Sequence, residues 1–390
     1  MLEQFRVSNF KSLVNADFRP VGLNLVVGTN NAGKTNLCHA LRFLSLTSKM
    51  PLEEAAKHCT PEPWNLPNVY TPDDTLEMEA NVVLPFEGDE LRFTYALRLA
   101  CRKSLGTAFT VSRESLKVTG GEFHDALLWE NEAGNVRLFH EKRLLGPPQM
   151  VGTTAPTDAT MLFRLYDLET RRANLFKRYL SSWGYYSFDA AQMRSNVATL
   201  MDRVLDSAGS NLCSVLYTLH NERPRDERKL VEAAKLMEPR LDLISFQAPD
   251  PEHVYMFFED KEGHRFGVQN VSDGTLRFLG LCFLIISNRR DEASGDPPPL
   301  LIIEEPENGI FVGHLKPLFE KLDPSGNQGQ FVFTSHNPYF IDLFDGALDG
   351  LHVIKSLGNY SAVTKPDPAR IQERLGKFSL GEMHFRGLLE

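Results

Sequence analysis

The 390-residue sequence predicts an α/β fold, because three apolar segments each end in polar residues that suit ligand binding. The strand predicted at 14–27 ends in a buried-type run at 23–27 and is followed by a glycine-containing loop and a helical segment at 35–48. Residues 300–303 form a second apolar run that ends in two glutamates, and 331–333 a third that ends in Thr-Ser-His. Strands that alternate with helices favour a parallel sheet, whose ligands gather at the carboxyl ends of its strands.

Composition excludes several classes of protein. The 42 basic and 51 acidic residues give a net charge of −9, so we do not expect a surface that coats nucleic acid, although a local basic patch is compatible. No apolar run approaches the roughly 20 residues of a membrane span. The first residues lack a basic segment followed by an apolar one, so we expect a cytoplasmic protein. Five scattered cysteines without a CxxC pair indicate small buried residues rather than a disulfide framework or zinc site: Cys38, Cys59, Cys101, Cys213 and Cys282.

The elements are expected in the following order. Residues 2–10 and 14–27 alternate apolar and polar side chains and predict two strands, and the Pro-rich stretch 51–75 predicts a loop. Alternating segments separated by Gly and Asp turns then predict an antiparallel meander: 76–84, 91–99, 108–118, 126–129 and 136–139, closed by a Gly/Pro/Thr stretch at 146–157.

Residues 160–240 are predicted to be mostly helical, with helices at 193–207 and 211–220. Strands and helices then alternate, at 254–258, 274–288, 300–304, 312–322 and 330–334. We therefore expect an α/β core at 1–50 and 250–390, an antiparallel β subdomain at 76–145, and a helical lobe inserted at 155–245.

Gly28 to Thr35 match the phosphate-binding pattern G-x-x-x-x-G-K-[ST] at every fixed position, between a strand and a helix. In such a loop, glycines let backbone N–H groups converge on phosphate oxygens, and the helix N-terminus favours negative charge. Lys34 would then contact the β- and γ-phosphates, and the Thr35 hydroxyl would bind Mg²⁺. The alternative is a glycine turn that contains Lys-Thr by chance.

Glu304 and Glu305 end the second apolar strand, and we assign Glu304 to the metal and Glu305 to the general base. Neighbouring residues on a strand point to opposite sides, so the two acids cannot share one role. The alternative is an acid-rich first turn of a solvated helix with Pro306 at its first position. His336, at the tip of the third strand, could hydrogen-bond a γ-phosphate, or could be structural.

Ser272 and Asp273 precede an apolar helix, so either could be an ordinary N-cap. A capped helix N-terminus also binds anions, and Ser272 with the Gly274 amide could contact a phosphate offered by another subunit.

Taken together, these motifs resemble the ABC-type ATPase heads of the RecF, SMC and OLD group, especially the stand-alone AAA-type ATPases of bacterial anti-phage operons. The opening residues Phe5 to Ser12 also look like the family's first strand. The resemblance implies a P-loop NTPase fold, an ABC ATPase head with an antiparallel β-meander and a helical insertion. It also implies ATP and Mg²⁺ as cofactors and a head-to-tail homodimer with two ATPs sandwiched between its subunits.

The resemblance assigns roles to individual residues. Asn30, Asn31, Ala32, Gly33, Lys34, Thr35 and Asn36 would bind the nucleotide, and Thr35 and Glu304 the metal. Glu305 and the switch residue His336 would be catalytic. Ser272, Asp273 and Gly274 would be the signature that contacts the γ-phosphate of the opposite protomer, and Pro306 to Asn308 the D-loop.

Some features depart from the family pattern. Glu304 stands where many ABC proteins have Asp, and Gln149 and Gln192 are both candidates for the Q-loop glutamine. The insertion lacks the sustained heptads of a long coiled coil. The residues after His336 are too few for a Toprim nuclease domain as well as the remaining strands, and we interpret Asp342, Asp345 and Asp349 as solvated charge.

Three functions remain open at this point. The first is a regulatory ATPase that controls a separately encoded nuclease or toxin, and the second is a RecF-like ATPase that clamps duplex DNA. For DNA, a cluster at Arg171, Arg172, Lys177 and Arg178 could form a phosphate-binding stripe or a solvated helix face. The third is a sensor that binds ATP and scarcely hydrolyses it.

Overall fold

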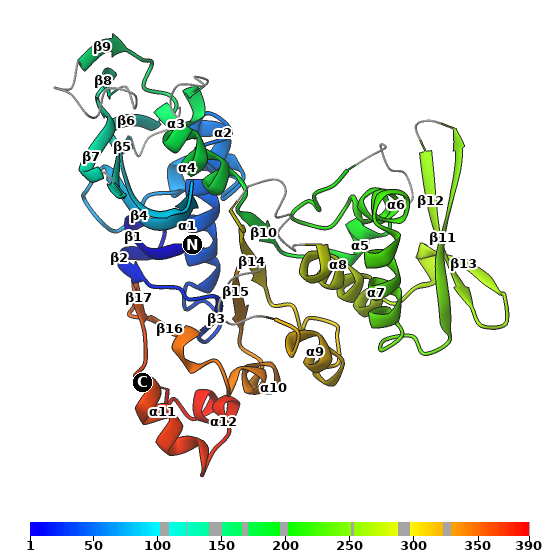
Figure 1. Ribbon diagram of the computed structural model, residues 1–390. Helices are drawn as coiled ribbons and strands as arrows, with labels where there is room; N and C mark the ends of the chain where they lie inside the picture. The colour runs from blue at the N-terminus through cyan, green and yellow to red at the C-terminus, as the bar shows by residue number, and fades with distance from the viewer. Residues whose placement is uncertain are drawn as a thin grey trace.

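A computed structural model describes residues 1–101, 109–121, 123–139, 150–165, 171–195, 202–250, 253–287, 297–322 and 329–389. Within them lie an eight-stranded sheet, a six-stranded sheet and a three-stranded sheet, with helices between and around them (Figure 1). The predicted α/β class with an antiparallel meander is confirmed. None of the helices in these residues is long and apolar enough to cross a membrane.

The eight-stranded sheet is antiparallel, in the order β2-β1-β4-β5-β6-β7-β8-β9. Its strands are β1 (Leu2–Phe10), β2 (Leu13–Phe18), β4 (Thr75–Phe86), β5 (Asp89–Cys101), β6 (Phe109–Gly120), β7 (Phe123–Glu132), β8 (Asn135–Phe139) and β9 (Met150–Thr154). The meander is therefore continuous with the N-terminal hairpin through the β1–β4 pair.

Two details of this region differ from the prediction. The single strand expected at 14–27 is two strands, β2 and β3 (Leu23–Val27), which belong to different sheets. Pro20 lies in the break, where a residue without an N–H group interrupts strand pairing. The Gly/Pro/Thr stretch that was expected to close the block contains β9, which pairs with β8.

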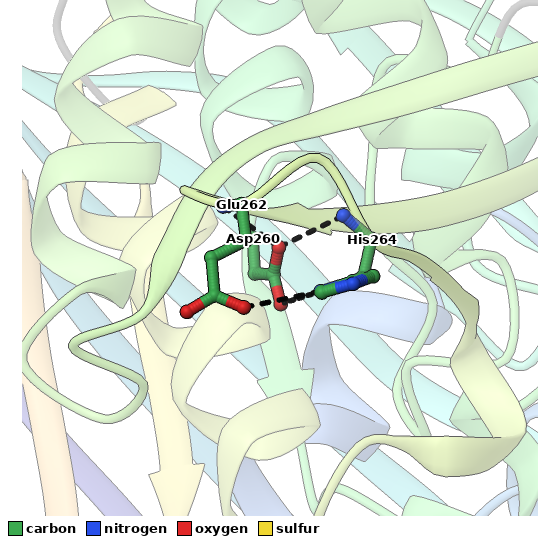
Figure 2. Close-up of side chains that lie close together, drawn as sticks. All are labelled: Asp260, Glu262 and His264. Atoms are coloured by element: carbon green, nitrogen blue, oxygen red, sulfur yellow. Dashed lines mark hydrogen bonds and ion pairs between the residues drawn. The ribbon is translucent and has the colours of Figure 1, made fainter.

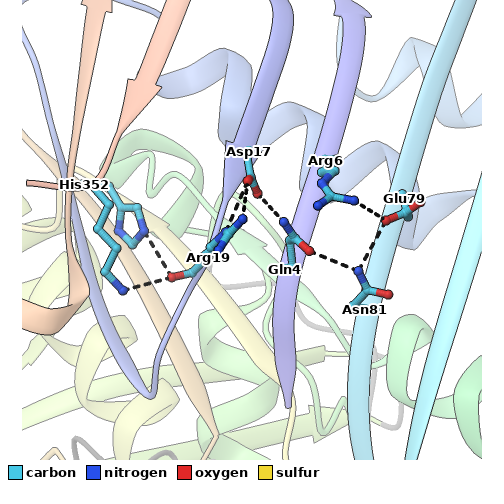
Figure 3. A network of polar contacts seen from close by, with 8 residues as sticks. Gln4, Arg6, Asp17, Arg19, Glu79, Asn81 and His352 are labelled. Atoms are coloured by element: carbon cyan, nitrogen blue, oxygen red, sulfur yellow. Dashed lines mark hydrogen bonds and ion pairs between the residues drawn. The ribbon is translucent and has the colours of Figure 1, made fainter. Parts of the chain in front are cut away.

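Polar side chains link the outer surface of β4, β1 and β2 to β16 (Leu351–Ser356) of the second sheet (Figure 3). Gln4 Nε2 donates to Asp17 Oδ1 at 2.8 Å, and Gln4 Oε1 accepts from Asn81 at 3.2 Å. His352 approaches the Arg19 carbonyl oxygen at 3.2 Å. A single hydrogen bond of this kind contributes only about 0.5–1.5 kcal/mol, so the network fixes alignment more than stability.

The six-stranded sheet has the order β10-β14-β15-β3-β16-β17 and is parallel except for β17. Its remaining strands are β10 (Gly184–Tyr186), β14 (Leu300–Glu304), β15 (Gln330–Ser335) and β17 (Ser361–Thr364). Its central strands are fully buried, as expected for a sheet covered on both faces.

Alternate residues of these strands face different cores. Val26, Ile302 and Val332 pack with α1 (Lys34–Leu46) and the eight-stranded sheet. Val27, Ile303 and Phe333 pack on the other side with α8 (Asp273–Ser287), α9 (Val312–Phe319) and α10 (Pro338–Ile341). This two-residue alternation places α1 between the two large sheets (Figure 1).

Buried Gln330, the first residue of β15, joins the two large sheets. Its Oε1 accepts from the Leu2 amide at 2.6 Å and from the Tyr179 hydroxyl at 3.1 Å. Its Nε2 donates to the Leu2 carbonyl at 2.8 Å. A buried amide with all these bonds fixes β1 of the antiparallel sheet against β15 of the six-stranded sheet.

The shorter helices lie at the ends and edges of the sheets. They are α2 (Leu52–Lys57), α3 (Met161–Arg164), α4 (Arg171–Ser181), α5 (Ala190–Met193), α6 (Leu212–Glu222), α7 (Pro224–Ala234), α11 (Pro368–Leu375) and α12 (Leu380–Phe385). The three-stranded sheet, β11 (Leu241–Asp250), β12 (His253–Asp260) and β13 (Arg265–Gly267), lies beyond α6 and α7 (Figure 1).

The helical segment expected at 193–207 is wrong where the structure describes it. Strand β10 precedes it, α5 ends at Met193, and residues 202–207 are irregular. Asp206 causes the turn that follows, because its carboxylate accepts from the Ala208 amide at 3.0 Å and the Ser210 amide at 2.8 Å. The five cysteines are buried and free, as predicted.

Glu114 of β6 is a buried carboxyl inside the first core. It accepts from the Tyr95 hydroxyl at 2.9 Å and from the Met161 amide at 2.7 Å, at the start of α3. Burial raises its pKa from 4.5 to about 7, although these hydrogen bonds oppose the shift.

This pKa predicts a pH-dependent stability. Between pH 4.5 and about 7 the folded protein retains a proton that the unfolded chain has released, so the free energy of unfolding should fall as pH rises. The slope should approach about 1.4 kcal/mol per pH unit and vanish above that window. Urea unfolding at pH 5, 6, 7 and 8 should therefore show that the free energy of unfolding of the wild type falls across the window relative to that of Glu114→Gln. Parallel curves for the two proteins would refute the assignment.

Candidate functional site

The carboxyl ends of β3, β14 and β15 meet at one edge of the six-stranded sheet. Glu304 pairs with Thr334, and Ser335 pairs with Val27, the residue before the glycine loop. The glycine loop, the glutamate pair and His336 therefore emerge side by side from neighbouring strands. This is the edge at which α/β sheets place their ligands.

The glycine loop, 28–33, bends sharply into α1. Asn31 and Gly33 both have positive φ, 63° and 111°. A Cβ at Gly28 would overlap the Ile354 carbonyl oxygen, and one at Gly33 would overlap the Ser361 hydroxyl. Gly28 and Gly33 are thus required for two reasons: β16 and β17 pack closely behind the loop, and Gly33 adopts a positive φ.

Lys34 is held inside the loop, with 7% of its surface exposed. Its Nζ donates to the carbonyl oxygens of Gly28 at 2.7 Å and Thr29 at 3.2 Å. Burial lowers the pKa of Lys34, while the charges of Glu305 and Glu304 raise it. The ammonium is aimed into the loop that would cradle phosphates.

Glu304 faces α1, where its Oε2 accepts from the Thr35 hydroxyl at 3.2 Å. Burial raises the pKa of Glu304, and the nearby Thr35 and Cys38 side chains oppose the rise. Its Oε1 is buried and has no hydrogen-bond partner among the described residues. A buried carboxylate oxygen left free beside a hydroxyl is a donor set that suits Mg²⁺, so these residues fit the metal that the P-loop implies.

Glu305 follows the strand with φ of +44°, a conformation that costs energy for a residue with a side chain. Its amide donates to the Thr334 carbonyl oxygen at 3.1 Å. Its Oε1 lies 3.0 Å from His336 Nδ1, and its Oε2 accepts from Asn308 at 2.9 Å. The two acids therefore have separate surroundings: Glu304 contacts α1, and Glu305 is fixed between His336 and Asn308.

One cavity of about 620 Å³ brings the candidate nucleotide residues together. Its lining consists of Asn30, Asn31, Ala32, Gly33, Lys34, Thr35, Asn36 and Glu305. The Asn36 amide is also engaged elsewhere, because it donates to the Ser12 hydroxyl at 2.7 Å.

Two further residues lie near the site: Glu307, which falls within the expected D-loop segment, and His384, to which the sequence analysis gave no role. Glu307 is 5% exposed and accepts from the Ser335 hydroxyl, and burial raises its pKa to about 7. His384 of α12 has its pKa lowered by burial, then by the charges of Lys34 and His336. The Glu-Glu-Pro-Glu run could have drawn attention to Glu307, but no local pattern marks His384.

The expected signature residues lie at the N-terminus of α8 and do not line the P-loop cavity. Ser272 Oγ accepts from the Thr275 amide at 3.0 Å, so Ser272 does cap the helix. A Cβ at Gly274 would overlap the Gly309 carbonyl oxygen, and Arg277 donates to the Asn308 carbonyl at 3.0 Å. The start of α8 thus packs directly on the turn that holds Glu305.

Arg194 fixes the segment before α8. Its Nη1 donates to the carbonyl oxygens of Val268 at 3.0 Å and Val271 at 2.8 Å, and its Nη2 pairs with Asp273. Gln192 lies two residues earlier, and its amide donates to Asp189 at 2.9 Å. Of the two Q-loop candidates, Gln192 thus follows β10 at the edge of the sheet, and Gln149 lies outside the described residues.

The basic cluster of α4 is occupied by contacts within the molecule. Arg171 pairs with Glu87 at 2.7 Å, and both Arg171 and Arg172 lie over the Phe86 ring. Lys177 donates to the Phe163 and Leu165 carbonyl oxygens, and Arg178 also has a partner. Of the three aspartates interpreted as solvated, Asp342 instead accepts from the Gly381 amide at 2.7 Å.

A separate group of possible metal ligands occurs in the turn between β12 and β13 (Figure 2). The Asp260 carboxylate accepts from the amides of Glu262 at 3.0 Å and His264 at 2.8 Å. These bonds account for the proximity of the three side chains as turn chemistry.

Residues 165–342 match a family described as "AAA domain, putative AbiEii toxin, Type IV TA system". Among curated proteins, none matches the chain significantly by sequence.

Solved structures share the fold at low sequence identity. A SmcHead bound to the C-winged helix domain of ScpA has a TM-score of 0.57 at 14% identity, covering 95% of this chain and 99% of that one. The Smc head of Pyrococcus furiosus, with an extended coiled coil and bound to the C-terminal domain of ScpA, gives 0.54 at 10%, with coverages of 96% and 98%. The Smc head of Pyrococcus yayanosii, with a coiled coil and joint, gives 0.51 at 10%, with coverages of 96% and 99%.

The predicted P-loop NTPase fold of the ABC head type is therefore confirmed. Residues 165–342 are thus similar to an AAA domain family, and the chain as a whole has the fold of the Smc head domains.

Proposed function

We propose that this protein is a cytoplasmic, ATP-hydrolysing regulatory subunit of a bacterial anti-phage system that controls a separately encoded nuclease or toxin. The observation that carries the ATPase part is the cavity at the ends of β3, β14 and β15. Lys34 and Glu305 line it, and Thr35 of its lining donates to the Glu304 carboxylate. The defence role is supported by the AbiEii description of the matched family.

In this proposal the phosphates of ATP lie on the backbone N–H groups of residues 30–35, at the N-terminus of α1. Lys34 exchanges its two carbonyl partners for β- and γ-phosphate oxygens. Thr35 and Glu304 hold Mg²⁺, which would neutralise charge on the phosphates.

Glu305 acts as the general base in hydrolysis. Its carboxylate is oriented by Asn308 on one oxygen and by His336 on the other. It can thus accept a proton from a water in line with the γ-phosphate, while His336 lies next to the same water and phosphate.

A second copy of the chain would complete the site. Ser272, Asp273 and Gly274 are outside the chain's own P-loop cavity and stand at a helix N-terminus, which favours a phosphate from another protomer. Gly274 and Arg277 contact the turn that follows Glu305. Binding of the partner's nucleotide at the start of α8 would therefore affect the position of Glu305 in the same chain. Opening and closing of this dimer would control the effector.

Lys34→Ala should weaken ATP binding at least tenfold, because it removes the cation that is directed into the loop. Isothermal titration with ATP and Mg²⁺ measures the change. The control is Lys57→Ala, which removes an exposed lysine paired with Glu53 at 3.2 Å on α2. Equal affinities for the two variants would contradict the proposed phosphate contact.

Glu305→Gln should lower ATP turnover by roughly 10²–10⁴-fold, the usual contribution of a general base, and leave ATP binding in place. Without hydrolysis the ATP-bound dimer should accumulate, so light scattering with ATP should report twice the monomer mass. Glu373→Gln, an equivalent change on exposed α11, is the control and should behave as wild type.

Unchanged turnover in Glu305→Gln would remove the catalytic assignment. Turnover that is absent in the wild type as well would favour an ATP-binding sensor. The RecF-like alternative would require ATP-dependent, salt-sensitive binding of duplex DNA by the wild-type protein.

A further inference from the structure

A second pocket lies behind α1, on the edge of the six-stranded sheet, and shares no lining residue with the P-loop cavity. It has a volume of about 210 Å³ and is formed by the end of α1, the strand β10 and residues 204–207. Its lining is Arg42, Ser45, Leu46, Lys49, His58, Trp183, Gly184, Tyr185, Tyr186, Val204, Leu205, Ser207 and Ile302. This set contains two strongly basic side chains, Arg42 and Lys49, and no carboxylate.

Arg42 is fixed in the wall of the pocket. Its guanidinium carbon lies 4.4 Å from the centre of the Tyr185 ring. One Nη donates to the His58 carbonyl oxygen at 2.8 Å, and the other to the Ser207 hydroxyl at 3.3 Å. A guanidinium has five N–H donors, so donors remain after these two bonds.

Lys49 is the second cation, and its ammonium forms no ion pair or hydrogen bond with the described residues. Burial and then the charge of Arg42 lower the pKa of Lys49. The nearby carboxylate of Asp206 forms hydrogen bonds within its own turn, because it accepts from the amides of Ser210 and Asn211. Two cations thus share a concave surface without a counter-charge, which is unfavourable unless an anion joins them.

We propose that this pocket, between Arg42 and Lys49, binds a phosphate group. A pre-oriented guanidinium with free donors, the exposed ammonium of Lys49 and the Ser207 hydroxyl suit the several acceptor oxygens of phosphate. The volume is below the roughly 300–1,000 Å³ of pockets that enclose drug-sized ligands, so it takes the phosphate and leaves the rest of the ligand outside. The group can belong to free phosphate or to the end or backbone of a nucleic acid.

The test uses full-length Lys34→Ala, so that the P-loop cannot retain the probe, and in parallel the wild type saturated with a non-hydrolysable ATP analogue. Inorganic phosphate is titrated by calorimetry, and Trp183 in the pocket wall supplies a fluorescence signal. We expect saturable binding in both backgrounds. Adding Lys49→Gln should weaken it at least tenfold, and the neighbouring control Lys57→Gln should leave it unchanged.

Lys49→Glu provides an independent readout. A carboxylate next to Arg42 would supply the missing counter-charge, so phosphate binding should be lost while the melting temperature rises. Three results would each overturn the proposal. The first is a lowered melting temperature in Lys49→Glu, and the second is no saturable phosphate binding in Lys34→Ala or in the analogue-saturated wild type. The third is a phosphate affinity that Lys49→Gln leaves unchanged.

Two oligonucleotides distinguish the sources of the phosphate. A 5′-phosphorylated oligothymidine that binds at least tenfold more tightly than the unphosphorylated one identifies a terminal phosphate. If both oligonucleotides bind with the same affinity, and more tightly than inorganic phosphate, the ligand is the backbone phosphate. Saturation by inorganic phosphate alone identifies the free ion. In each case Lys49→Gln must weaken the observed binding.

Discussion

The parallel register of β3, β14 and β15 is the constraint on which the rest of the molecule depends. Glu304 opposite Thr334, and Ser335 opposite Val27, place three strand ends at the same level. A shift of one residue would turn Glu304 away from α1 and Thr35, because neighbouring strand residues face opposite sides. The alternating apolar residues of the same strands oppose such a shift, since they fill two different cores.

Connections to other elements hold this edge in place. Gln330 joins β15 to Leu2 and Tyr179, so the large antiparallel sheet and α4 are attached to the strand that ends at His336. On the opposite core, the start of α8 packs on Gly309, and Arg277 holds the Asn308 carbonyl. The turn that presents Glu305 thus contacts the N-terminus of α8, which gives a physical route between residues 272–274 and Glu305.

The sequence predicted those features that depend on short segments. The glycine loop, the acid pair and the meander strands are each encoded within a few residues by a fixed pattern or by alternation. It failed where distant partners decide the structure: β2 and β3 separate because they join different sheets, and the segment 202–207 follows the Asp206 turn instead of a helix. The approach of His384 to Lys34 depends on the packing of α12 near α10, which no local pattern reports.

By itself, the sequence determined which residues could contact a nucleotide and in what order they occur, because phosphate and metal chemistry restrict the residue types at fixed spacings. Only the tertiary structure decided how they are used. It left Glu304 Oε1 without a partner beside Thr35, fixed Glu305 between Asn308 and His336, and occupied the α4 cations with internal contacts. It also gathered Arg42 and Lys49 around one pocket, because burial and hydrogen bonding depend on segments that are distant in the chain.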